Sequence, residues 1–182
     1  PGLEELLKQE LDDLGPWDKI RLVPGGCEVK TDPAGVFKLV LNTRIAESVR
    51  VRIGSYRTRN FDELRSSMAR VPWAAWLPRN SEPEVRVSCR KSKLWHSGAV
   101  EQRVSQQVHD RLNDPSRDDT PEAARVYLRI DHDHVTVSID ASGERLHKRG
   151  ERTSVGKAPI RETLAAAMCR AARLDDDRPI WD

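Results

Sequence analysis

The stretch from Glu84 to Asn113 constrains the fold most, because it joins two different periodicities through one short loop. Apolar and polar residues alternate from Val85 to Cys89, which predicts a strand with one buried face. Apolar residues then recur at every fourth position, which predicts a helix with one buried face. They are Val100, Val104, Val108 and Leu112. The stretch therefore predicts a strand, a loop and a helix, as in an α+β fold.

The loop between this strand and this helix is cationic. Arg90, Lys91 and Lys93 have no acidic neighbour, and two rings that could stack follow at Trp95 and His96. The predicted helix begins directly after the rings. Because a helix N-terminus beside a cationic loop suits an anion, the stretch is a candidate phosphate-binding site.

The composition is that of a polar protein, since 37% of the 182 residues are hydrophobic and 33% are charged. This length suits one ordinary domain or two small ones packed together. No apolar run approaches the roughly 20 residues that a membrane helix needs, and the N-terminus lacks the layout of a signal peptide. We therefore expect a cytoplasmic protein with no membrane contact.

Three cysteines, Cys27, Cys89 and Cys169, lie far apart without the spacing of a zinc site. A disulfide framework is not expected, and buried free thiols are the simplest interpretation.

The charges are sorted along the chain although the net charge is only +2. Five acids against one lysine give residues 1–15 a charge of −4, and four acids against one arginine give residues 174–182 a charge of −3. Five arginines against one glutamate give residues 44–59 a charge of +4, and residues 143–161 reach the same value. Such sorting favours a polyanionic partner, with ordinary solvated faces as the alternative.

The first 59 residues predict a ferredoxin-like unit. A leucine-rich helix over 3–14 precedes a hairpin over 20–30, a helix that Asp32 caps with Pro33 in its first turn, and a strand from Val49 to Ile53. This is the βαββαβ order without its first strand. Pro1 is not a natural start, so we expect a fragment that lacks this strand and leaves an unpaired sheet edge.

The middle of the chain predicts a further helix over 61–71 after an Asn60 cap, and a hairpin over 126–139. Trp73 and Trp76 are expected in the core, with a stacking platform for bases as the alternative. The run from Asp131 to His134 contains metal-ligand residue types, but four consecutive turn residues point apart, so we expect no metal site. No motif of a hydrolase or nucleotide-binding loop occurs.

The segment from Gly143 to Met168 reads GERLHKRGERTSVGKAPIRETLAAAM. It resembles the LHxRGYR and API[KR]ExLAAA segments that precede the catalytic domain of THUMP-containing RNA methyltransferases, with Glu151 where tyrosine is common. The opening residues, PGLEELL, and the segment SCRKSKLWHSGAV are similar to the same proteins, with Trp95 where tyrosine often stands. The resemblance covers nearly the whole chain in the family's order.

This resemblance implies that a ferredoxin-like unit (1–59) and a THUMP domain (60–142) grip ribosomal or transfer RNA. Residues 143–182 would be a linker and helix leading to a methyltransferase domain that binds S-adenosylmethionine. The glycine-rich cofactor loop and the catalytic motif of that domain are absent from these residues. The fragment is therefore expected to have no catalytic, cofactor or metal residues and no activity of its own, whereas the full-length protein is expected to be an enzyme.

The candidate RNA-binding residues are basic or aromatic side chains of the strand, loop and helix, joined by two arginines of the linker. They are Arg86, Arg90, Lys91, Lys93, His96, Arg103, Arg149 and Arg152. Phosphate contacts suit the basic groups, and a ring at Trp95 or His96 could stack on an unpaired base. Packing under the helix is the alternative for Trp95, and contact with the missing domain is the alternative for the linker arginines. The competing function is a structural segment whose basic faces dock on the catalytic domain, with RNA held elsewhere.

Overall fold

The computed structural model describes residues 2–114, 124–143, 145–148 and 159–174. The chain forms two compact units, of which the first comprises residues 1–49 and 144–182 and the second comprises residues 50–143. Arg149 and Arg152 lie outside the described residues. No helix in the described ranges has an apolar stretch of the length needed to span a bilayer.

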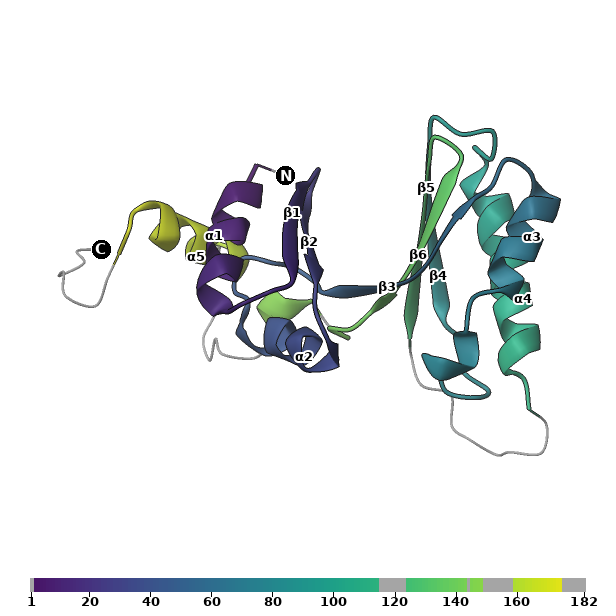
Figure 1. Cartoon of the computed structure of the whole chain (residues 1–182), viewed down its shortest axis with the longest axis horizontal. Helices are drawn as coiled ribbons and strands as arrows, with labels where there is room; N and C mark the ends of the chain where they lie inside the picture. Colours follow the sequence, from purple (N-terminus) through teal and green to yellow (C-terminus); the bar gives the residue numbers. More distant parts are fainter. Residues whose placement is uncertain (1, 115–123, 144, 149–158, 175–182) are drawn as a thin grey trace. The chain divides into compact units, whose positions relative to one another are not determined.

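The described part of unit 1 contains a two-stranded sheet and three α-helices (Figure 1). The elements are α1 (Glu4–Leu14), β1 (Lys19–Val23), β2 (Gly26–Lys30), α2 (Pro33–Asn42), the short 3₁₀ helix η2 (Leu146–Lys148) and α5 (Glu162–Ala171). The predicted hairpin is confirmed, because β1 and β2 pair antiparallel around the Pro24–Gly25 turn. The predicted cap is also confirmed, since the Asp32 side chain accepts a hydrogen bond from the Gly35 amide at 2.8 Å.

The carboxylate of Glu10 is buried in α1 and organises the loop after α2. It accepts hydrogen bonds from the Thr43 hydroxyl at 2.6 Å and from the amides of Arg44 and Ile45 at 2.8 and 3.3 Å. This buried acceptor satisfies the Thr43 hydroxyl and two backbone amides of the loop that follows α2. Glu10 therefore fastens α1 to the C-terminal end of α2.

Replacing Glu10 by glutamine is expected to destabilise unit 1 by about 1–3 kcal/mol, because an amide turns one acceptor into a donor that faces other donors. Urea unfolding followed through hydrogen exchange of the β1 and β2 amides measures this change. Glu5→Gln, at an exposed position on the same helix, is the matched control and should change stability by less than about 0.5 kcal/mol. Equal stability of the two variants would contradict the role of Glu10.

The described parts of the C-terminal segment pack within unit 1. The Leu146 amide donates to the Glu47 carbonyl at 2.9 Å, and the Glu47 carboxylate pairs with Arg145 and Arg161. Arg170 of α5 pairs with Asp13 of α1. These contacts make η2 and α5 part of the fold of unit 1.

Outside residues 115–123, unit 2 is a four-stranded sheet with helices on one face (Figure 1). Its elements are β3 (Arg50–Arg57), α3 (Phe61–Ala69), η1 (Trp73–Ala75), β4 (Glu84–Arg90), α4 (Ser97–Leu112), β5 (Arg125–Asp131) and β6 (His134–Asp140). The strand order is β3-β6-β5-β4, in which only the β4–β5 pair is parallel. Helix α4 supplies the crossover that a parallel pair requires. The α+β class predicted from the sequence is confirmed.

The strand predicted at Val49–Ile53 exists as β3, but its expected place in the ferredoxin-like unit is corrected. It pairs with β6 from Arg50↔Asp140 to Arg57↔His134, and it belongs to unit 2. The physical reason is its length, because β3 continues to Tyr56, whose side chain packs with Ile53 against the core of unit 2. Strand β6 pairs with β3 along this length.

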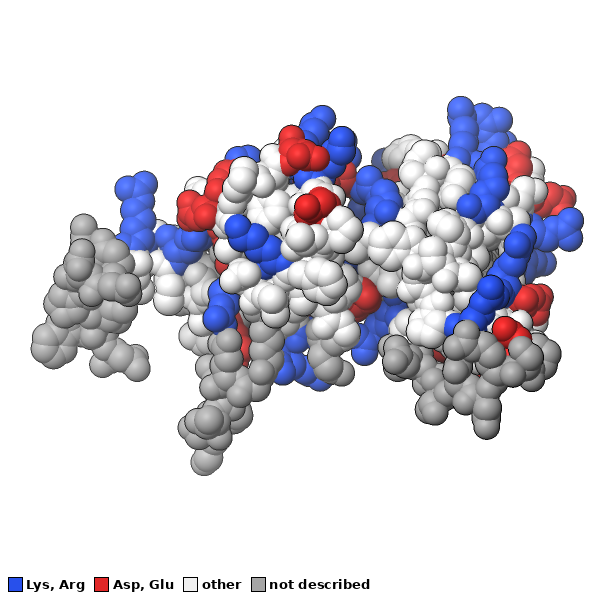
Figure 2. Space-filling view, turned by 60° about the horizontal axis from the view of Figure 1, so that its bottom comes forward, with Lys and Arg blue, Asp and Glu red and all other residues white. Residues whose placement is uncertain are grey.

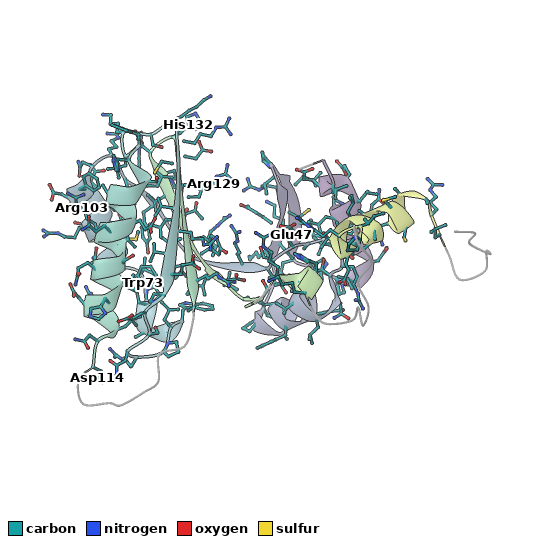
Figure 3. The ribbon with its side chains drawn as sticks, turned by 180° about the vertical axis from the view of Figure 1, so that it is seen from behind. Glu47, Trp73, Arg103, Asp114, Arg129 and His132 are labelled. Carbon is teal, nitrogen blue, oxygen red and sulfur yellow. The ribbon has the colours of Figure 1, made fainter. Side chains whose placement is uncertain are left out.

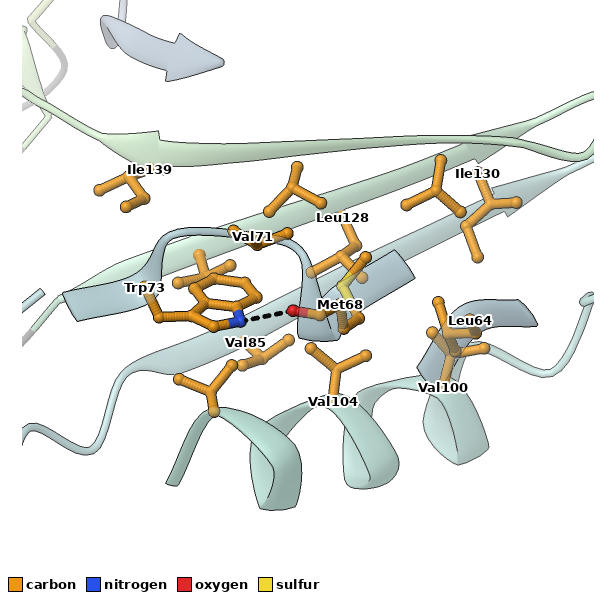
Figure 4. Packing of buried hydrophobic residues seen from close by; sticks show 14 of the residues in the cluster. Leu64, Met68, Val71, Trp73, Val85, Val100, Val104, Leu128, Ile130 and Ile139 are labelled. Atoms are coloured by element: carbon orange, nitrogen blue, oxygen red, sulfur yellow. Dashed lines mark hydrogen bonds between the residues drawn. The ribbon is translucent and has the colours of Figure 1, made fainter. Parts of the chain in front are cut away.

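The core of unit 2 lies between the sheet and the helices (Figure 4). The four residues predicted on the buried face of α4 are all fully buried, which confirms the four-residue period. Trp73 is only 2% exposed, and its indole N–H donates to the Met68 carbonyl at 2.9 Å. The same prediction for Trp76 is wrong, since this side chain is 47% exposed just beyond η1. Cys169 is likewise exposed rather than buried, and Cys27 and Cys89 are half-buried.

Candidate nucleic-acid interface

One end of unit 2 brings together three loops that are far apart in the sequence. Asp133, in the tight turn between β5 and β6, connects them. Its carbonyl accepts from the Thr58 amide at 2.8 Å, and its carboxylate accepts from the Lys93 amide at 2.7 Å. Its own amide donates to the Ser92 hydroxyl at 3.0 Å. The ends of β3 and β4 are thereby held against the β5–β6 turn.

The geometry of this turn explains the Asp-His-Asp-His run. His132 and Asp133 both have positive φ, 51° and 59°, as a two-residue turn of type I′ requires. His132 contacts the Asp131 carboxylate at 2.7 Å, and His134 contacts the Ser55 hydroxyl at 2.7 Å. Burial alone would raise the pKa of Asp131, but hydrogen bonds from His132 and Arg129 outweigh it and lower that pKa. Within the described ranges no group of three or more ligand-type side chains could hold a metal ion.

Five cationic side chains belong to the segments that Asp133 connects, and we call them, with the rings of Trp95 and His96, the basic end. The cations are Arg57, Arg59, Arg90, Lys91 and Lys93. All five are exposed, and in the part of the chain that the structure describes no carboxylate forms an ion pair with them. Figure 2 shows blue side chains projecting from the upper edge of unit 2, which is drawn on the right. Figure 3 places His132 at the tip of the hairpin between β5 and β6.

The loop of the basic end has a defined conformation. The Ser92 hydroxyl donates to the Arg90 carbonyl at 2.8 Å, the His132 amide donates to the same carbonyl at 3.2 Å, and Leu94 is buried beneath the loop. Lys91 adopts a positive φ of 45°, which turns the chain sharply. Because the backbone is anchored at both sides of the lysines, a polyanion would meet them already positioned, and little ordering entropy would be lost.

Removing the Asp133 anchor is expected to loosen this loop. In Asp133→Gly the left-handed backbone is kept, but the carboxylate acceptor of the Lys93 amide is lost, so exchange of that amide should accelerate by about tenfold or more. Amide hydrogen exchange measures it. His132→Gly, at the neighbouring positive-φ position, is the matched control and should leave the Lys93 amide unchanged. Equal acceleration in both variants would show that the turn as a whole, and not the carboxylate, holds the loop.

The two rings lie beside the lysines. Trp95 is 75% exposed, so its packing under the helix, one of the two alternatives from the sequence, is excluded. Its ring centroid lies 5.6 Å from that of His96, with the ring planes tilted by 55°. The His96 Nδ1 accepts from the Ala99 amide at 3.2 Å and so caps α4. This bond leaves the proton of the neutral ring on Nε2, where it can be donated outward.

Arg103 lies on the outer face of α4, and its guanidinium stacks on the ring of Phe61 with its carbon 3.9 Å from the centroid (Figure 3). Phe61 opens α3 only two residues after Arg59, so Arg103 adjoins the basic end. Helices α3 and α4 both start at this end of the sheet, capped by Asn60 and His96. The N-terminus of α4, whose first turn carries no acidic residue, adds a favourable field for anions to that of the basic side chains, whereas the first turn of α3 carries Asp62 and Glu63.

Arg86 lies apart from the basic end, on the sheet face that carries no helix. Its guanidinium pairs with Glu84 at 2.6 Å, and their hydrogen bond lowers the pKa of Glu84 and raises that of Arg86. On the same face Arg129 pairs with Asp131, and Arg50 stacks on Tyr127 with its guanidinium carbon 3.6 Å from the ring centroid. These arginines already have partners within the protein, and a polyanion would have to compete for them.

The structure therefore brings together Arg90, Lys91, Lys93, His96 and Arg103 of the predicted set, and it separates Arg86 from them. Three residues of this end were not among the candidates: Arg57, Arg59 and Asp133. The basic composition of residues 44–59 was the available signal for the two arginines. The sequence contains no signal that a turn aspartate would join them to the loop.

Two family models match the chain: the RlmL ferredoxin-like domain over residues 1–50 and the THUMP domain over residues 58–140. YpsC of Bacillus subtilis, named as a candidate RNA methyltransferase, is 29% identical over the whole of this chain and 48% of its own length. Ribosomal RNA large subunit methyltransferase K/L of Syntrophotalea carbinolica is 32% identical over 96% of this chain and 25% of its own length. The chain thus spans half or less of the length of these relatives.

Among solved structures, a protein of Listeria monocytogenes has a similar fold. It is named as a predicted N6-adenine-specific DNA methylase. It is 31% identical, the match covers 98% of this chain and 48% of that one, and the TM-score is 0.82. The similarity includes both units of the chain.

Proposed function

Because the chain belongs to the THUMP-domain family, with an RlmL-type ferredoxin-like domain before its THUMP domain, we propose that it is the RNA-binding part of an RNA methyltransferase. Structured ribosomal or transfer RNA is its ligand. Base methylation is the work of a further domain that uses S-adenosylmethionine, and the full-length protein acts in the cytoplasm. The relatives named as methyltransferases, of which this chain spans only a part, support the division into binding and catalytic parts.

One observation carries the proposal: the five exposed cations of the basic end have no carboxylate partner among the described residues and are held by one anchored turn. Cations without internal partners can neutralise phosphates at no cost in broken ion pairs. Arg103 extends the same surface along α4. Positions 149 and 152 remain candidates on the grounds of the sequence alone.

Titration of the 182-residue chain with a labelled RNA hairpin over a salt series tests the proposal. If the five cations each neutralise one phosphate, the logarithm of the affinity should fall with the logarithm of salt concentration with a slope of about −3.5 to −4.5. A DNA hairpin of the same sequence is the comparison. Absence of RNA binding would contradict the proposal, and tighter binding of DNA would favour the substrate named for the Listeria structure.

Trp95 should contribute when the RNA offers an unpaired base. Replacing Trp95 by alanine is expected to weaken binding of a hairpin with a single-stranded 3′ end by about 5-fold to 150-fold, because a stacked base contributes roughly 1–3 kcal/mol. A blunt hairpin should bind almost as before. Trp76→Ala, another exposed tryptophan of unit 2, is the matched control. Equal losses on both RNAs would mean that Trp95 does not read an unpaired base.

The competing function, a segment whose basic surface docks on the catalytic domain, predicts a different result. The isolated chain would then show no RNA affinity that depends on the basic end. The reading frame beyond Asp182 provides a separate test of the catalytic part, since a glycine-rich cofactor loop is expected there.

A further inference from the structure

A pocket lies on the face of the unit 2 sheet that carries no helix. Its volume is about 380 Å³, which is within the usual size range of small-ligand sites. Its lining includes three arginines, a tyrosine and a serine from strands β3, β4 and β5. They are Arg50, Arg86, Arg129, Tyr127 and Ser88. Figure 3 shows Arg129 on the side of the sheet away from α4. Because guanidinium groups recognise anions by paired hydrogen bonds, this lining predicts an anionic ligand.

Strand pairing brings these side chains together. In the parallel ladder of β4 and β5, Arg86 lies opposite Tyr127 and Ser88 lies opposite Arg129. All four side chains are on the same face, since residues two apart in a strand share a face. Arg50 belongs to β3, which β6 separates from β5, and its guanidinium carbon lies 3.6 Å from the centroid of the Tyr127 ring. The pocket therefore depends on the sheet topology and not on one stretch of sequence.

The arginines of this pocket keep donors open for a ligand. Stacking on Tyr127 uses a face of the Arg50 guanidinium, whereas its N–H groups lie in the plane and have no acceptor among the described residues. Each of the other two arginines pairs with one carboxylate two residues away on its own strand, which engages only part of the guanidinium. These pairs are Arg86 with Glu84 and Arg129 with Asp131. The Ser88 hydroxyl is exposed and has no hydrogen-bond partner in the described ranges.

We propose that this pocket binds the phosphate monoester of a nucleotide. Three arginines against two carboxylates leave a local charge of +1, which suits one small anion better than a polyanionic strand. A phosphate monoester carries a charge of about −1.5 to −2 at neutral pH and offers three terminal oxygens to guanidinium donors. A nucleobase can stack on the guanidinium face that Tyr127 leaves open, because Arg50 is exposed.

The pocket is separate from the basic end and goes beyond the proposed function. The phosphate monoester has two possible sources, a free nucleotide and the 5′ end of an RNA, which present the same group. An internal phosphodiester of RNA has one terminal oxygen fewer and carries a single charge, so it matches the pocket less well. The pocket thus distinguishes a chain end or a mononucleotide from the body of a strand.

Titration of the 182-residue chain with adenosine 5′-monophosphate tests the proposal, with NMR amide shifts as the readout and adenosine as the comparison. The monophosphate should bind at least about tenfold more tightly than adenosine, because only the phosphate engages the arginines. Its shifts should centre on residues 86–88 and 127–129. Equal affinity of the two compounds, or monophosphate shifts centred on the basic end, would overturn the proposal.

Three variants identify the groups that bind the monophosphate. Arg50→Gln should weaken its binding about tenfold or more. Arg129→Gln removes a second guanidinium without changing the stack of Arg50 on Tyr127, and it should weaken binding by a similar factor. Arg65→Gln is the matched control, because it removes an equally exposed arginine of unit 2 from α3, and it should change binding less than about twofold. Unchanged affinity in either pocket variant, or an equal loss in the control, would overturn the proposal.

Two RNA hairpins that differ only at the 5′ end identify the source of the phosphate. If the RNA end is the ligand, the 5′-phosphate hairpin should bind at least about fivefold more tightly than the 5′-hydroxyl hairpin, and Arg50→Gln should abolish this difference. Equal affinity of the hairpins together with monophosphate binding would support a free nucleotide as the ligand. Monophosphate binding by a chain that binds neither hairpin would support this inference and contradict the proposed function.

Discussion

Replacing Lys91 and Lys93 together by glutamate is expected to weaken RNA binding by the 182-residue chain at least about 30-fold. Each lysine that contacts a phosphate at an exposed site contributes on the order of 1 kcal/mol, and charge reversal adds repulsion. The salt slope should also become shallower by about 1.4 to 1.8, since two contacts are lost. Fluorescence anisotropy with the RNA hairpin over a salt series measures both quantities.

The matched control is the double change of Lys19 and Lys30 to glutamate. These two lysines are exposed partners on β1 and β2 of unit 1, so the same residue type and the same charge are altered far from the basic end in the sequence. The control should lose less than about threefold. If both double variants lose the same affinity, the overall charge and not the basic end governs binding. Circular dichroism should show an unchanged fold in both, because the four side chains are exposed.

The second large effect concerns stability. Replacing Trp73 by alanine should destabilise unit 2 by about 3–5 kcal/mol, because a large buried side chain is lost and a cavity remains. The Met68 carbonyl would also lose the indole donor, which lies at 2.9 Å. Hydrogen exchange of the β5 and β6 amides in urea follows the unfolding of this unit.

Trp76→Ala is the control for this experiment, since the same residue type is removed three positions further on from a side chain that is 47% exposed. It should cost less than about 1 kcal/mol. A comparable cost for the two tryptophans would mean that the assignment of the core is incorrect at η1. Comparison of Trp73→Ala with Trp76→Ala also separates the effect of lost core packing from the effect of removing a tryptophan.

Local patterns in the sequence predicted the elements well. The four-residue spacing from Val100 to Leu112 depends only on the geometry of a helix, and all four residues are buried. The caps at Asp32 and Asn60 depend on the next three residues, and both side chains accept the expected hydrogen bonds. Such features need no knowledge of distant parts of the chain.

Properties that depend on distant partners were not predictable in this way. Strand β3 joins the sheet of unit 2 because it pairs along its length with β6. Strand β6 lies about eighty residues further along the chain, so the sequence around β3 does not show this partner. Trp73 and Trp76 have the same local composition around them, and only the course of η1 decides which one enters the core. Trp95 illustrates the same limit, because its 75% exposure follows from the way Leu94 anchors the loop.

Only part of the candidate site could be predicted, because the rest of it also depends on residues that are distant in the sequence. The cationic loop can be read from consecutive residues. That Glu84 engages Arg86 while Lys91 and Lys93 have no carboxylate partner among the described residues depends on side-chain geometry. The connection of Arg57 and Arg59 to this loop depends on Asp133, a contact across about forty residues of sequence on one side and seventy-five on the other.

The central claim is that the basic end of unit 2 is the RNA-binding surface, and NMR mapping of amide shifts during titration with an RNA hairpin tests it most directly. We predict the largest shifts at residues 57–59, 91–100 and 132–134, with smaller ones near Arg103. Shifts confined to unit 1 would contradict the claim. So would shifts centred on Arg86, Tyr127 and Arg129, on the sheet face that carries no helix.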